Sequence, residues 1–101
     1  MAKTVRITTR YTDEDMRLSQ IGEYQDGSPA YALFDANGEE YATATVCIPG
    51  NTPPSGHVLI KNWSENEGVL ESLVAAGILQ VVADVPSGFV NAQLCKLLVS
   101  I

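Results

Sequence analysis

Hydrophobic and polar residues alternate over several short stretches of the chain, and this pattern predicts β-strands. From Thr4 to Thr9, Val5 and Ile7 fall on one side of the chain and polar residues fall on the other. Alternation with β-branched residues is typical of a strand that is buried on one face. Further strands are predicted over residues 17–24, 31–34, 41–48, 57–62, 78–83 and 89–99.

An Asn-Gly pair between two of these stretches predicts a β-hairpin. Asn37-Gly38 suits the positive φ angles of a type I′ turn, whose twist matches that of paired strands. With this pair at the tip, Leu33 lies opposite Ala42 and Phe34 lies opposite Tyr41. The alternation then puts one set of apolar residues on a single face, which we expect to be buried. This set is Tyr31, Leu33, Ala42, Ala44, Val46 and Ile48.

One helix is predicted over residues 65–76. Ser64-Glu65-Asn66-Glu67 matches a capping box, in which the Ser oxygen accepts a hydrogen bond from a free amide at the helix start. Apolar residues follow at helical spacing, and Gly77 suits the left-handed residue after a helix. Trp63 precedes the expected cap, and we expect its ring to pack back on Val69.

Turn-forming residues separate these elements. Residues 26–29, 49–56 and 85–88 are rich in Gly, Pro, Ser and Asp and predict turns or loops. Thr12 to Asp15 fits either a capped helical turn or a solvated loop. The order of strands, one helix and further strands predicts an α+β fold for residues 1–101. We expect a single small domain, with a mainly antiparallel sheet of about five to seven strands and the helix on one face.

The balance of charge narrows the classes of partner. The chain of 101 residues has 12 acidic and 6 basic side chains, a net charge of -6, and 46% of its residues are hydrophobic. The electrostatic field of this negative charge repels phosphates, so unaided binding to nucleic acid is disfavoured. A basic protein surface is a suitable partner instead. Solubility alone is the alternative explanation for the excess acid. The residues predicted to bind a partner are Asp13, Glu14, Asp15, Glu23, Asp26, Glu39 and Glu40.

No pattern of residues in the sequence predicts catalysis, a cofactor or a metal. His57 is the one histidine, and no acid is placed to orient it toward Ser55. A single His and two distant Cys do not make a zinc set, and the calcium-loop spacing is absent. Cys47 and Cys95 lie in apolar segments, which predicts buried free thiols in a reducing cytosol.

The sequence also predicts a cytoplasmic protein that does not enter a membrane. The segment MAKTVRITTR has no apolar stretch of signal-peptide length. The longest apolar stretch runs from Leu73 to Ala83, and a spanning helix needs about 20 apolar residues.

Three segments of the chain resemble a family of small uncharacterised bacterial proteins. These are YALFDANGEEYATATVCIP, IKNWSENEGVLESLVAAGI and VPSGFVNAQLCKLL, in which the SENEG and PSGF segments are similar. The resemblance covers roughly residues 30–99 and leaves residues 10–28 outside. Members are carried on conjugative elements, plasmids and prophages, and they have no assigned activity. The resemblance implies a setting in which small acidic proteins, including anti-CRISPR proteins, inhibit host defence by stoichiometric binding.

Three hypotheses follow from these observations. The first is a non-catalytic module that binds a basic, nucleic-acid-binding host protein through its acidic surface. The second is a self-assembling accessory protein that forms a homodimer through exposed sheet edges. The third is a small enzyme or ligand-binding domain, in which His57 and the Pro49–Gly56 loop would form the site.

Overall fold

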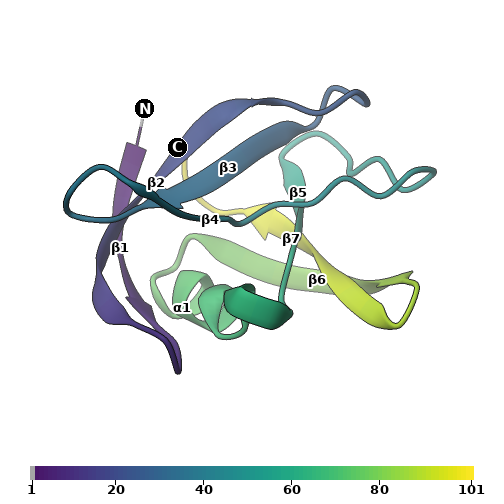
Figure 1. The fold of residues 1–101 in the computed structure, drawn as a ribbon. Helices are drawn as coiled ribbons and strands as arrows, with labels where there is room; N and C mark the ends of the chain where they lie inside the picture. Colours follow the sequence, from purple (N-terminus) through teal and green to yellow (C-terminus); the bar gives the residue numbers. More distant parts are fainter. Residues whose placement is uncertain (1) are drawn as a thin grey trace.

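Seven antiparallel strands and one helical region make up the molecule. A computed structural model describes residues 2–101 (Figure 1). The elements are β1 (Ala2–Thr8), β2 (Asp13–Glu23), β3 (Pro29–Phe34), β4 (Glu40–Thr43), β5 (His57–Ile60), the 3-10 turn η1 (Ser64–Asn66), α1 (Val69–Ala75), β6 (Leu79–Ser87) and β7 (Val90–Leu97). The predicted α+β class with a mainly antiparallel sheet is confirmed.

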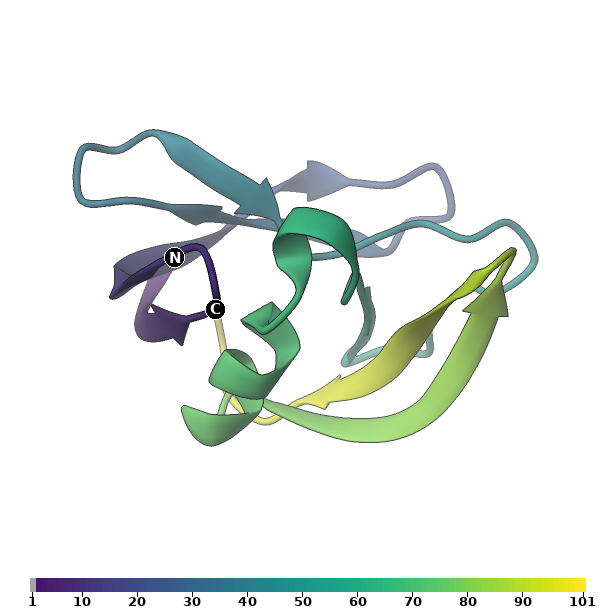
Figure 2. The same cartoon turned by 60° about the horizontal axis from the view of Figure 1, so that its bottom comes forward.

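The strands form two sheets, which are connected by the segment between β4 and β5. One sheet has the order β1-β2-β3-β4, and the other has the order β5-β7-β6. The segment after β4 crosses between them, because Val46 donates its N–H to Leu59 and Lys61 donates its N–H to Ala44. The helix α1 packs against β1 and β6, which are one edge strand of each sheet (Figure 2). The two sheets and α1 therefore surround a shared core.

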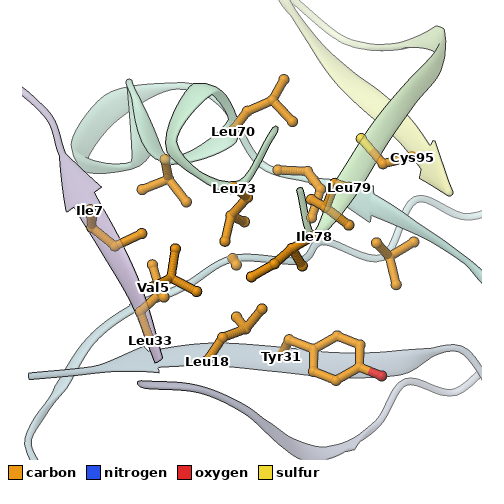
Figure 3. Close-up of a cluster of buried hydrophobic side chains, with 14 of the residues drawn as sticks. Val5, Ile7, Leu18, Tyr31, Leu33, Leu70, Leu73, Ile78, Leu79 and Cys95 are labelled. Atoms are coloured by element: carbon orange, nitrogen blue, oxygen red, sulfur yellow. The ribbon is translucent and has the colours of Figure 1, made fainter. Parts of the chain in front are cut away.

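The core contains the residues that the alternating pattern selected. Val5 and Ile7 of β1 and Leu33 of β3 face Leu73 of α1, and all four are at most 2% exposed (Figure 3). Of the face predicted around residues 31–48, every member is buried except Val46, which is half-buried. Burying one such aliphatic side chain contributes about 1.5–3 kcal/mol, so this face accounts for much of the stabilisation.

The hairpin between β3 and β4 has the predicted position but a different turn. Leu33 pairs with Ala42 as expected, but the register then shifts, and Phe34 pairs with Glu40 instead of Tyr41. The Asp35 carboxylate accepts hydrogen bonds from the N–H groups of Asn37 and Glu39. The Gly38 N–H donates to the Asp35 carbonyl, so the loop is longer than a two-residue type I′ turn. The type I′ prediction was wrong because the Asp35 side chain stabilises the longer loop.

The predicted helix over 65–76 is divided in two. Gly68 has a φ of 94° and separates η1 from α1, which begins at Val69. Neither segment has a side-chain hydrogen bond at its start, so the predicted capping box at Ser64 is wrong. A Cβ atom at residue 68 would lie 3.0 Å from Cγ2 of Thr9. Glycine is required here both by the left-handed backbone and by the close approach of the β1–β2 connection.

Trp63 packs elsewhere than predicted. Its ring lies against a second, smaller cluster of Ile48, Leu59 and Ala92, whereas Val69 belongs to the main core. The Lys61 ammonium lies 5.9 Å from the centre of the Trp63 ring. The expected contact with Val69 is therefore wrong, since the break at Gly68 removes the helical geometry on which it depended.

Two segments predicted as turns belong to strands. Asp13 to Asp15 begin β2, where they pair with residues 6–8 of β1. Val85 and Pro86 belong to β6, and the β6–β7 turn is confined to Gly88 and Phe89 between the paired residues 87 and 90. Proline is compatible with β6 because this strand is at the edge of its sheet.

Candidate partner-binding surface

The seven acids predicted to bind a partner lie in three places. Residues 13–15 begin β2, Glu39 and Glu40 lie at the β3–β4 turn, and Glu23 and Asp26 lie at the β2–β3 turn. Because Arg17 of β2 pairs with Phe34, the first two groups share one end of the sheet. Glu23 pairs with Pro29 at the opposite end. The structure therefore brings five of the seven acids to one end and separates the other two from them.

The group in β2 is partly neutralised by Arg6. Its Nε lies 3.0 Å from Oδ1 of Asp13, and its Nη1 lies 3.5 Å from Oδ1 of Asp15. The hydroxyl of Thr8 donates a second hydrogen bond to Asp13 at 2.9 Å. The side-chain hydrogen bond from Arg6 is the largest cause that lowers the pKa of Asp13, followed by the bond from Thr8. Asp13 therefore stays ionised, and the positive charge of Arg6 lies beside it.

The remaining carboxylates at this end are less constrained. Glu14 is half-buried and points to the opposite side of β2 from Asp13 and Asp15, where it accepts a hydrogen bond from Thr12. Glu39 and Glu40 are exposed, and neither makes an ion pair among residues 2–101. The β1–β2 and β3–β4 hairpins diverge from this end of the sheet (Figure 1). The freest negative charge is thus at the β3–β4 turn.

The acids at the opposite end include one with a structural role. Asp26 accepts hydrogen bonds from both the N–H and the hydroxyl of Ser28, and the hydroxyl is the largest cause that lowers the pKa of Asp26. The Cys47 thiol also lies 3.8 Å from the other oxygen of Asp26. Asp26 is half-buried and stabilises the β2–β3 turn, whereas Glu23 is exposed.

The predicted alternative site around His57 is a small depression. The Pro49–Gly56 loop and the β2–β3 turn enclose about 330 Å³ beside His57. The His57 Nδ1 lies 3.0 Å from the backbone carbonyl of Ser55. The histidine is therefore held by the loop backbone, and it makes no hydrogen bond with Asp26 or with the Ser55 hydroxyl in the described structure. This arrangement orients the ring without forming a nucleophile and base pair.

A larger depression is lined by polar residues near β4. It has a volume of about 540 Å³, and Tyr24, Tyr41 and Lys61 are among its lining residues. The Tyr24 hydroxyl hydrogen-bonds with the Thr45 hydroxyl, and Lys61 forms an ion pair with Glu65 at 3.0 Å. The Tyr41 hydroxyl, by contrast, is buried and makes no hydrogen bond in the described structure. Tyr24 is half-buried, whereas Tyr11 is exposed.

The two cysteines occupy different environments. Cys95 is buried in the main core, and burial raises the pKa of its thiol to about 11. Cys47 is only half-buried, and burial followed by the nearby Asp26 charge raises the pKa of its thiol. Both thiols are free. The predicted burial is confirmed for Cys95 and is wrong for Cys47, which is only half-buried.

Within residues 2–101, no group of three or more His, Cys, Asp or Glu side chains is arranged to hold a metal ion. No helix in the same range has the length and apolar character needed to cross a membrane.

The sequence did not predict that β1 has backbone groups on its outer edge without a neighbouring strand. The Thr9 N–H donates to Thr12 on the β2 side, so the odd-numbered residues of β1 direct their backbone groups toward β2. The Thr8 N–H points the other way and donates to Oγ of Ser72 in α1 at 3.0 Å. Thr4 and Arg6 share the parity of Thr8, so their backbone groups also point away from β2. The alternating pattern of β1 predicted its buried side, but nothing local predicts which of its edges is free.

Comparison with known proteins gives no relatives. The chain matches no protein-family model, and neither a curated protein nor a solved structure is similar to it.

Proposed function

We propose that the chain is a non-catalytic module that binds a basic protein through the acid-bearing end of its four-stranded sheet. The supporting observation is that Asp13, Glu14, Asp15, Glu39 and Glu40 lie on two hairpins at the same end of this sheet. Arg6 forms ion pairs with two of these carboxylates but offsets only one negative charge, and the net charge of the chain is -6. A concentrated negative field speeds association with a basic surface and selects against acidic ones.

The resemblance to proteins of mobile elements and prophages suggests the kind of partner. A nucleic-acid-binding host protein presents a basic surface that normally contacts phosphates. Carboxylates that occupy this surface exclude nucleic acid without any chemical step, as in a stoichiometric inhibitor of the anti-CRISPR kind. We therefore propose a cytoplasmic inhibitor that acts by occupancy, with no cofactor and no turnover.

A charge-reversal pull-down tests this proposal. The tagged chain is incubated with bacterial lysate at low and high salt, and the captured proteins are identified by mass. High salt should release a captured basic protein, because salt screens the attraction between exposed charges. Glu39→Lys with Glu40→Lys should abolish capture of the same protein, because it replaces two negative charges with positive ones. The matched control is Glu23→Lys with Asp84→Lys, which changes the net charge equally at positions away from this end.

Two results would count against the proposal. Equal loss of the partner in both double variants would show that net charge, and not this end of the sheet, is responsible. Retention of every partner at high salt and in both variants would remove the acidic surface from the interaction altogether.

A further inference from the structure

The free edge of β1 is the strand edge best suited to receive another strand. The backbone groups of Thr4 and Arg6 point away from β2, as established by the directions of the Thr8 and Thr9 hydrogen bonds. No backbone or side-chain partner lies on that side of Thr4 or Arg6 among residues 2–101. Two N–H and two C=O groups are thus available in one row. Such a row forms hydrogen bonds with an extended chain.

The other outer strands are poorly suited to the same role. The segment after β4 pairs with β5 through Thr45 and Ile60, and β6 is the remaining edge strand, in the other sheet. A bulge interrupts its register between Val81 and Ala83. Ser87 and Val90 close a two-residue turn, so the next residue, Pro86, has its nitrogen on the side away from β7. Proline has no N–H to donate there. Bulges and outward prolines protect an edge from pairing, and β1 has neither.

A groove runs beside the free part of β1. Arg6 and Thr8 form one wall, and Glu71, Ser72, Ala75 and Ala76 of the α1 segment form the other, with a volume of about 400 Å³. Ser72 occupies the Thr8 end of the edge, so an added strand would start at Arg6 and continue toward Ala2. The short side chains of Ala75 and Ala76 leave room for an apolar side chain. The exposed Glu71 carboxylate can pair with a basic side chain next to it.

We propose that an extended segment of a basic protein partner adds antiparallel to β1, with an apolar side chain in this groove and a Lys or Arg beside Glu71. This inference rests on the proposed protein-binding function and assigns it a binding mode. A second copy of this chain fits the edge less well. Each copy carries a charge of -6, and pairing over residues 2–6 alone buries far less than the roughly 1,000 Å² of a stable interface.

A peptide selection with an edge-blocking variant tests the inference. A phage-displayed library of random heptapeptides is selected on the immobilised chain. We expect binders with alternating apolar residues, a Lys or Arg and no central proline. Thr4→Pro should weaken them at least tenfold, because it removes one outward N–H. Asp84→Pro is the matched control, since it removes an outward N–H from β6, and it should leave affinity unchanged.

Amide hydrogen exchange on the unmodified chain keeps the test valid if Thr4→Pro does not fold. Bound peptide should slow exchange at Thr4 and Arg6, while Val5 and Ile7, already bonded to β2, should change little. The inference is overturned by a selection without binders, by equal binding to both proline variants, or by a dimer that Thr4→Pro dissociates. Peptide binding that survives Glu39→Lys with Glu40→Lys separates this site from the acidic end of the sheet.

Discussion

The hydroxyl of Ser72 takes the place of a neighbouring strand for Thr8. It accepts the Thr8 N–H at 3.0 Å and lies 3.2 Å from the Thr8 carbonyl, although the two residues are 64 positions apart. The same hydroxyl lies 3.1 Å from the Gly68 carbonyl, so its one hydrogen is shared between two acceptors. One side chain therefore joins α1 to the end of β1 and limits the free part of that edge.

Ser72→Ala should destabilise the fold by about 1–3 kcal/mol, because it leaves the partly buried Thr8 N–H without a partner. Urea unfolding followed by circular dichroism measures this change. Ser55→Ala is the control, since the side chain of this exposed loop residue makes no hydrogen bond in the described structure. Equal stability of the two variants would contradict the assigned role of Ser72.

Gly68→Ala should cost about 2–4 kcal/mol, the sum of a left-handed backbone for a non-glycine residue and a contact with Thr9. Gly88→Ala imposes a positive φ of 64° without any atom within 4 Å, so it should cost only the backbone part. Thermal unfolding of both variants gives the comparison. A Gly88→Ala change as damaging as Gly68→Ala would mean that the contact with Thr9 contributes nothing.

Arg6→Gln should raise the pKa of Asp13 toward the ordinary value for aspartate, since Arg6 is the largest cause of its lowering. The folded pKa lies below the unfolded one. Ionised Asp13 therefore stabilises the fold above the unfolded pKa, and this contribution is lost as the pH falls through the folded pKa. Carbon-detected NMR titration of the carboxyl groups reports the shift. Asp26 is an internal control, because Ser28 and not Arg6 lowers its pKa.

The two thiols should differ in reactivity. At pH 8 a thiol reagent should label half-buried Cys47 slowly in the folded chain and reach Cys95 only on unfolding. Asp26→Asn should speed labelling of Cys47, because the Asp26 charge contributes to its raised pKa. Mass spectrometry of timed samples identifies the labelled cysteine, and labelling of Cys95 at the rate of Cys47 would refute its burial.

Local patterns predicted β1 well because this strand buries one face. The position of β1 and the pairing of Leu33 with Ala42 follow from alternation and turn residues alone. The turn itself depended on how the Asp35 carboxylate bonds to the loop, which the Asn-Gly pair does not specify. The break at Gly68 depended on Thr9, which is distant in sequence. Contacts between distant segments therefore set the details that the pattern missed.

The candidate surface was harder to predict than the fold. Charge counts selected residues 13–15 as partner-binding, in a segment predicted to be a capped helical turn or a loop. They are strand residues instead, and Arg6 on the neighbouring strand pairs with Asp13 and Asp15. Composition gives the amount of charge, whereas strand pairing determines which carboxylates gather and which are compensated. Glu23 and Asp26 are separated from the other acids because β2 carries the chain from residues 13–15 at one end of the sheet to the β2–β3 turn at the other end.

Pro86 and the bulge in β6 have a consequence for how copies of this chain behave when they are concentrated. A fibre grows only when each molecule pairs with one neighbour through one strand edge and with the next neighbour through a second strand edge. The two sheets have four outer strands: β4 and β5 are joined through the bridge between Thr45 and Ile60, β1 is fit for pairing, and β6 is blocked. Any strand added to β1 therefore ends the growth that it begins.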